Sequence, residues 1–123
     1  NNNLKKLKMT HYETVFILTP VLSESQVEEA VNKFNDFVTA NGGEIVAKEN
    51  WGLKKLAYSI QNKRNGFYHL VEFKTENAEL VSQLEVAYKR DERVLRFLTV
   101  KLDKHGMDWA EKRRTKLKSN SNK

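Results

Sequence analysis

Residues 50–74 read NWGLKKLAYSIQNKRNGFYHLVEFK, and this stretch decides the fold. Leu56, Tyr58 and Ile60 alternate with other residues before the polar run QNKRNG at 61–66. Beyond that run, the aromatic and β-branched residues of FYHLVEFK favour a second strand. Gly52 interrupts the alternation as a β-bulge would. The stretch therefore predicts a hairpin with strands over 44–60 and 67–74, joined by a polar loop at 61–66.

A helix is predicted on each side of this hairpin. Ser23 begins S-E-S-Q, a capping-box pattern completed by Gln26, and glycines at 42 and 43 favour an end just after Asn41. Apolar residues recur between these signals at helical spacing: Val27, Ala30, Val31, Phe34 and Val38. The second helix is expected to be capped by Asn77 and to end in two cations. Its apolar stripe is Leu80, Leu84, Ala87 and Tyr88.

A first and a fourth strand complete the pattern, at Tyr12–Thr19 and Val94–Leu102. The order strand, helix, strand, strand, helix, strand predicts an α+β fold of the ferredoxin-like type, with a four-stranded antiparallel sheet and two helices on one face. Two helices cover only one face of such a sheet. Because the first, third and fourth strands carry apolar residues at both alternations, we expect the uncovered face to be apolar and to meet a partner.

The positive charge of the chain is segregated along its length. Residues 1–11 form a basic N-terminal extension of net charge +3, and residues 104–123 form a basic arm of net charge +5 that we expect to be flexible. The domain between them, residues 12–103, has a net charge of −2. Within it, residues 48–64 carry +4, so a polyanion is expected to meet one side of the molecule.

Several functional classes find no support in the sequence. There is no cysteine and no apolar run near the roughly 18 residues of a membrane span, so we expect a cytoplasmic protein without disulfides. His11, His69 and His105 are scattered without metal-ligand spacing. No nucleophile motif or glycine-rich phosphate loop occurs, and residues 19–22, TPVL, differ from the anion loop of an acylphosphatase. We therefore expect no catalysis, cofactor, metal or small-molecule substrate.

Three segments carry a resemblance to a known family: HYE at 11–13, WGLKKLAYSI at 51–60 and KRDERVLRFLTVK at 89–101. Together they resemble the bacterial ribosomal small-subunit protein six family, the bS6 type. Ser59 stands where that family often has proline. The resemblance implies a non-catalytic protein of the small ribosomal subunit, bacterial or organellar. It also implies a heterodimer with small-subunit ribosomal protein eighteen, which binds the central domain of small-subunit ribosomal RNA in the platform.

The alternative is a stand-alone RNA-binding module similar to the RNA-recognition motif, which shares the element order and stacks bases on strand aromatics. VFIL at 15–18 and NGFYHLVEF at 65–73 resemble its two signature segments. The third-strand match fails at three positions, where Tyr68 replaces a small residue, His69 a stacking aromatic and Glu72 a final aromatic. On this reading Phe16 and His69 would stack bases.

Two groups of side chains are candidates for binding. Lys54 and Lys55 would meet RNA phosphates or the protein partner, with Trp51 and Tyr58 as rigid anchors. Alternatively, the lysines protect an edge strand and lay their stems over Trp51.

Arginines near the last strand form the second group, for which the alternative is a helix-dipole contact by Arg90 and pairing with Asp91 and Glu92. The complete set of predicted RNA-binding or partner-binding residues is Trp51, Lys54, Lys55, Tyr58, Arg90, Arg93, Arg96, Lys101, Arg113 and Arg114.

Overall fold

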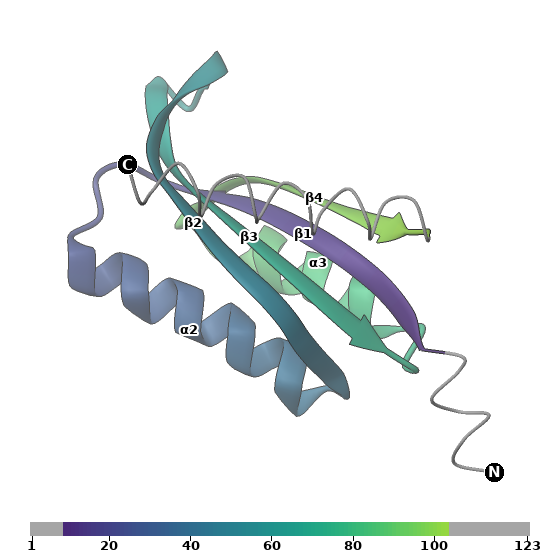
Figure 1. Cartoon of the computed structure of the whole chain (residues 1–123). Helices are drawn as coiled ribbons and strands as arrows, with labels where there is room; N and C mark the ends of the chain where they lie inside the picture. The colour runs from purple at the N-terminus through teal and green to yellow at the C-terminus, as the bar shows by residue number, and fades with distance from the viewer. Residues whose placement is uncertain (1–8, 104–123) are drawn as a thin grey trace, which may run out of the picture.

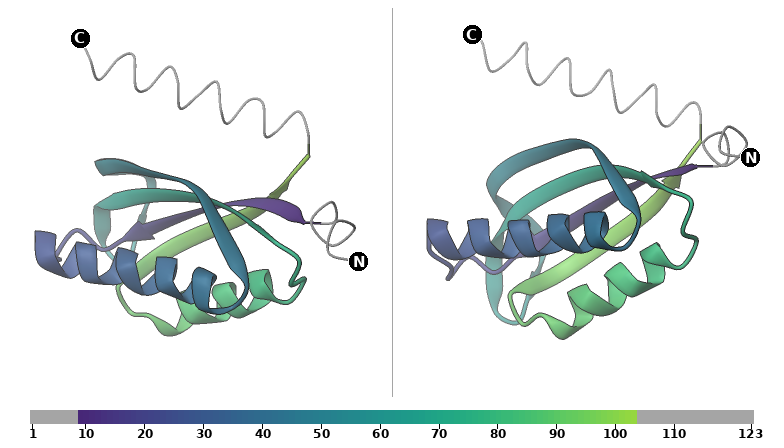
Figure 2. Two further views of the ribbon diagram at one scale, coloured as in Figure 1. Left: turned by 60° about the horizontal axis from the view of Figure 1, so that its bottom comes forward. Right: turned by 90° about the horizontal axis from the view of Figure 1, so that it is seen from below.

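The computed structural model describes residues 9–103, which form one four-stranded antiparallel sheet and two helices (Figure 1). The elements are β1 (Thr10–Leu18), α2 (Glu24–Ala40), β2 (Gly43–Ile60), β3 (Lys63–Thr75), α3 (Leu80–Arg90) and β4 (Val94–Leu102). The strand order is β2-β3-β1-β4. Both helices lie on the same side of the sheet (Figure 2). The predicted ferredoxin-like fold is confirmed.

An aromatic cluster joins both helices to the sheet. Phe16 of β1 packs against Phe34 of α2 and Tyr88 of α3, with ring centroids 5.4 and 5.3 Å apart. Phe34 and Tyr88 also contact each other at 4.7 Å. The Tyr88 hydroxyl lies 3.0 Å from Thr14 Oγ1, which accepts a hydrogen bond from Thr99. These contacts place the even-numbered residues of β1 on the face that the helices cover.

We call the opposite side the open face, because no helix among residues 9–103 covers it. Strand register and alternation place these side chains on it: Glu13, Val15, Ile17, Glu49, Trp51, Tyr68, Leu70, Glu72, Arg96, Leu98 and Val100. The expectation of an apolar face was correct for β4, where Leu98 is 64% and Val100 40% exposed. It was only partly correct for β1 and β3, where Val15, Ile17 and Leu70 share this face with Glu13 and Glu72. The strand β2, for which no such expectation was made, adds Glu49.

The boundaries of α2 follow the predicted signals, and α3 ends at Lys89 and Arg90 as predicted, but the start of α3 differs from the prediction. The Ser23 side chain accepts from the Gln26 backbone, and the Gln26 side chain accepts from the Ser23 backbone, so the capping box forms. At the second helix, the side-chain oxygen of Asn77 accepts from Glu79 N in a preceding turn, and α3 begins only at Leu80. Asn77 is therefore not the cap. Its Nδ2 donates to Asn41 O and ties this turn to the end of α2.

The β2–β3 hairpin is longer and its turn tighter than predicted. Only Gln61 and Asn62 form the turn, with φ of 52° and 64°, and β3 already begins at Lys63. Two successive positive φ values are typical of a type I′ turn, whose twist matches that of the strands. The predicted bulge at Gly52 is confirmed, with φ of 76° and a shift in register.

Gly66 allows β1 and β2 to pack closely across β3 on the open face. A Cβ atom at this position would lie 2.3 Å from Ile17 Cγ2 and 3.8 Å from Leu56 Cδ2. Ile17 and Leu56 are only 7% and 6% exposed, so they form a small apolar cluster at the base of the hairpin. The missing side chain at Gly66 is what leaves room for Ile17.

We predict that Gly66→Ala lowers the free energy of unfolding by about 1–3 kcal/mol, because the new methyl group overpacks this cluster. Asn65→Ala, at the exposed neighbouring position, should change it by less than about 0.5 kcal/mol. Chemical denaturation measures both. In a double-mutant cycle, Ile17→Ala should reduce the cost of Gly66→Ala. Additive effects would contradict the proposed contact.

Candidate RNA and protein interface

The hairpin projects past both helices (Figure 1), and we call residues 51–67 the projecting hairpin. Lys54 and Lys55 on β2 and Arg64 on β3 are exposed, while Lys63 is half-buried. No aspartate or glutamate occurs from residue 50 to residue 71. The projecting hairpin therefore presents four cations without a compensating carboxylate of its own, as a phosphate-binding surface requires.

Trp51 and Tyr58 differ in how they are held. The Trp51 ring stacks on Tyr68 with centroids 6.4 Å apart, and its Nε1 donates to Glu49 Oε1 at 3.1 Å. Trp51 is therefore fixed to the open face at the base of the projecting hairpin. Tyr58 is 79% exposed near its end, and Leu53 is 56% exposed. Large exposed aromatic and apolar side chains of this kind are typical anchors for a protein partner.

Sequence reasoning missed Lys63 and Arg64 as individual candidates. Both lie in the run QNKRNG, which was interpreted as a loop, whereas the structure places them at the start of β3. The Ile60–Lys63 and Lys55–Asn65 pairs bring them alongside the end of β2. The absence of acidic residues around them was the available signal.

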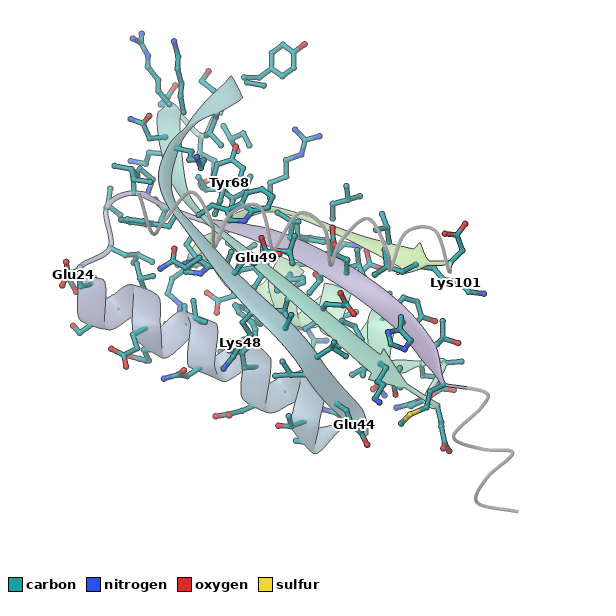
Figure 3. All side chains as sticks on the ribbon, viewed as in Figure 1. Glu24, Glu44, Lys48, Glu49, Tyr68 and Lys101 are labelled. Atoms are coloured by element: carbon teal, nitrogen blue, oxygen red, sulfur yellow. The ribbon has the colours of Figure 1, made fainter. Side chains whose placement is uncertain are left out.

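The structure separates the predicted cations of α3 and β4. Arg90 is exposed at the end of α3, on the helix-covered side of the sheet. Arg96 is exposed on the open face, paired with Ile17 of β1. Lys101 is exposed on the edge strand β4, far from Lys48 on the opposite edge (Figure 3). These cations belong to different surfaces, so they do not form one patch. Arg113 and Arg114 lie outside the described residues.

Arg93 is half-buried and is held by the buried carboxylate of Asp91. Its Nε and Nη2 atoms donate to the two oxygens of Asp91 at 3.0 and 2.8 Å, and Lys33 Nζ donates to the same carboxylate at 2.9 Å. Hydrogen bonds from Arg93 and Lys33 hold the pKa of Asp91 well below its usual range, although burial opposes this shift. Asp91 therefore connects α2 to the turn before β4. The pairing that we considered as the alternative role of Arg93 is present.

The positions that an RNA-recognition motif would use for base stacking lie on the covered face. Phe16 is 0% exposed under both helices. His69 is 6% exposed and stacks on Phe16 at 5.6 Å, and burial lowers its pKa. Neither ring is accessible to a base in this fold, so the alternative loses its two predicted stacking residues.

A shallow groove between α2 and β2 is lined by polar and apolar side chains, including Glu28, Asn35, Lys48 and His69. Figure 3 shows Lys48 beside α2, at the rim of this groove.

Among residues 9–103, no three acidic or histidine side chains are grouped to hold a metal ion. Within the same range, neither helix is long and apolar enough to cross a membrane.

Comparison with known proteins points to one family. The family model described as ribosomal protein S6 matches residues 11–101. The small ribosomal subunit protein bS6 of Flavobacterium johnsoniae is 64% identical over 111 residues, covering 90% of this chain and 97% of the relative. The bS6 protein of Bacteroides thetaiotaomicron is 57% identical over 112 residues, and the match covers 91% of this chain and 96% of the relative.

A solved structure gives the same result. The crystal structure of 30S ribosomal protein S6 from Thermotoga maritima superimposes with a TM-score of 0.75 at 25% sequence identity. The match covers 89% of this chain and 99% of the other.

We predict that Asp91→Asn lowers the free energy of unfolding at neutral pH by about 2 kcal/mol, because hydrogen bonds to a charged group are removed. In the native chain, a depressed carboxyl pKa contributes stability that is complete above the unfolded value of about 3.9 and is lost as pH falls below it. The variant should therefore lose less stability on acidification. Denaturation at a series of pH values measures this, with Glu28→Gln as the control at an exposed position. If the free energy of unfolding fell equally with pH in the native chain and in Asp91→Asn, the stabilising role of the Asp91 carboxylate would be contradicted.

Proposed function

The chain belongs to the ribosomal protein S6 family, and on that premise we propose that it binds the central domain of small-subunit ribosomal RNA together with small-subunit ribosomal protein eighteen. It acts there as a structural constituent of the small ribosomal subunit. Its relatives are ribosomal proteins by name, and this role requires binding surfaces and no catalytic group. The observation that carries the proposal is the projecting hairpin, which combines four cations with exposed apolar side chains.

The RNA-binding part of the proposal uses the cations of the projecting hairpin. Lys54 and Lys55 are exposed on β2, while Arg64 is exposed on the paired strand β3. Because neighbouring residues of a strand point to opposite faces, Lys54 and Lys55 can contact phosphates on two sides of the hairpin. Extension beyond the helices lets an RNA backbone approach without meeting the acidic N-terminal half of α2.

The protein-binding part uses Tyr58, near the end of the projecting hairpin, and Leu53, near its base. Both are largely exposed. A partner that covers these side chains would gain apolar burial and would immobilise a hairpin that has no helix behind it. Fixing the hairpin in this way would reduce the entropy cost of RNA binding, so we expect tight RNA binding only with both proteins present.

We predict that Lys54→Gln combined with Lys55→Gln weakens binding of the two-protein complex to central-domain RNA by about tenfold at moderate salt. The slope of log affinity against log salt should become shallower by about 0.7–0.9 for each phosphate that the variant no longer neutralises. Electrophoretic titration measures both quantities.

The matched control is Lys48→Gln combined with Lys74→Gln, which removes the same charge from elsewhere on β2 and β3. Its affinity and salt slope should stay close to those of the native chain. Equal weakening in the two double variants would show only a general charge effect. Unchanged RNA affinity in the hairpin variant would reject the hairpin as the RNA contact.

We also predict that Tyr58→Ala lowers affinity for ribosomal protein eighteen by at least about tenfold, since buried aromatic anchors dominate interface energies. Calorimetric titration of the two proteins without RNA measures this. Val86→Ala, which truncates an exposed apolar residue on α3, is the control and should bind normally. Normal binding by Tyr58→Ala would exclude this anchor.

A further inference from the structure

Two buried polar side chains line the groove between α2 and β2, which we call the α2–β2 groove. Its volume is about 590 Å³, within the roughly 300–1,000 Å³ of typical binding pockets. Asn35 of α2 and His69 of β3 are only 7% and 6% exposed there. Neither Asn35 Oδ1 nor His69 Nε2 has a hydrogen-bond partner among residues 9–103. Because roughly 90% or more of buried polar groups in native proteins are paired, two such atoms in one groove indicate a polar ligand.

Both side chains can present an acceptor to the groove. The Asn35 amide makes no side-chain hydrogen bond to another described residue, so a half-turn that brings its oxygen to the groove breaks none. Phe16 covers one face of the His69 ring at 5.6 Å. A stacked base would need a whole ring face, whereas a hydrogen bond needs one atom. Burial lowers the pKa of His69, so the imidazole is neutral at pH 7 and one of its nitrogens can accept.

Two carboxylates of α2 determine the charge of the groove. Glu24 and Glu28 line it one helical turn apart, both are exposed, and neither forms an ion pair within residues 9–103. Lys48 also lines the groove, farther along α2 than Glu24 (Figure 3). A further glutamate, Glu49, already accepts a hydrogen bond from Trp51 Nε1. Two available carboxylates against one lysine favour a cation over an anion.

The other walls of the groove are apolar. Val27 and Val31 of α2 and Phe67 of β3 line it and are half-buried. A guanidinium group has five N–H donors, no acceptor and a permanent positive charge, and its flat faces pack against aromatic side chains. The groove offers the matching features, which are two buried acceptors, two exposed carboxylates and apolar walls. Among the ionised side chains of proteins, arginine fits this combination best.

We propose that the α2–β2 groove binds an arginine side chain of a protein partner, whose guanidinium donates to Asn35 and His69 and pairs with Glu24 and Glu28. A protein is favoured over RNA because the two carboxylates repel phosphates. The site goes beyond the proposed function, since neither the cations of the projecting hairpin nor Tyr58 depend on it.

NMR titration of the isotope-labelled full chain with Nα-acetylarginine amide tests the proposal. The probe should shift the side-chain amide signals of Asn35, the ring signals of His69 and the methyl signals of Val31, and these shifts should saturate. The methyl signals of Leu98, on the open face, should not move. Nα-acetylcitrulline amide has a similar shape without the charge and should bind at least about fivefold more weakly.

Three results of this titration would overturn the proposal. Absence of shifts in the groove would show that it does not bind the side chain. Equal binding of the two probes would show that the guanidinium charge is not recognised. Adenosine monophosphate should leave the groove signals unchanged, and shifts of the same signals by this nucleotide would assign the groove to nucleic acid instead.

Matched charge variants test the carboxylates. Glu24→Gln combined with Glu28→Gln should weaken binding of the arginine probe by about fivefold. Glu76→Gln combined with Glu79→Gln removes the same charge from exposed positions before α3 and should leave binding unchanged. Equal weakening in both double variants would reveal a general charge effect and would contradict the site.

Asn35→Leu separates ligand binding from a structural role. It replaces the amide by an apolar group of similar size, so it should weaken binding of the probe by about fivefold or more. The free energy of unfolding should stay constant or rise, because an unpartnered buried amide is removed. A less stable variant with normal binding would assign the amide to the fold and reject the contact. No RNA or partner protein is present, so failure here leaves the proposed function untouched.

Discussion

Packing of Phe16 against Phe34 and Tyr88 is the contact on which the rest of the structure depends. It holds α2, α3 and the central strand β1 together and thereby assigns both helices to one face of the sheet. The bond between the Tyr88 hydroxyl and Thr14 satisfies a polar group that would otherwise be buried without a partner. Because both helices pack on this side, no helix among residues 9–103 covers the other face of the sheet.

Local sequence signals predicted most of the fold. The capping box at Ser23, the glycines after Asn41 and the periodicity of both helices act over a few residues, so they can be recognised without knowing tertiary contacts. The hairpin turn was not predicted correctly, because Gln61 adopts a left-handed conformation that its side chain does not favour. Strand pairing on both sides of the turn imposes that conformation, and pairing cannot be read from the turn residues alone.

The candidate site was less predictable than the fold. Lys54, Lys55 and Tyr58 are exposed on the projecting hairpin, as a binding role requires, but the arginines near β4 are divided among separate surfaces. Arg93 illustrates the difficulty, since its neighbour Asp91 was visible in the sequence while the burial of that carboxylate was not. The grouping of Glu13, Glu49 and Glu72 on the open face was also missed, because these residues come together only through strand register. The sequence gives the charge of each residue, but the net charge of a surface depends on which strands pair and in which register.

The bulge at Gly52 has a consequence for how such a surface can change during evolution. One extra residue in β2 reverses the alternation, so Trp51 before it and Lys54 and Leu56 after it all lie toward the same side of the sheet. No atom lies within 4 Å of the place where a side chain on Gly52 would begin, so the core does not constrain this position. Inserting or deleting one residue there would move every later side chain of β2 to the opposite face of the hairpin and would leave the helices unchanged. One such event could therefore change which side chains the hairpin presents to a ribonucleoprotein, without many substitutions.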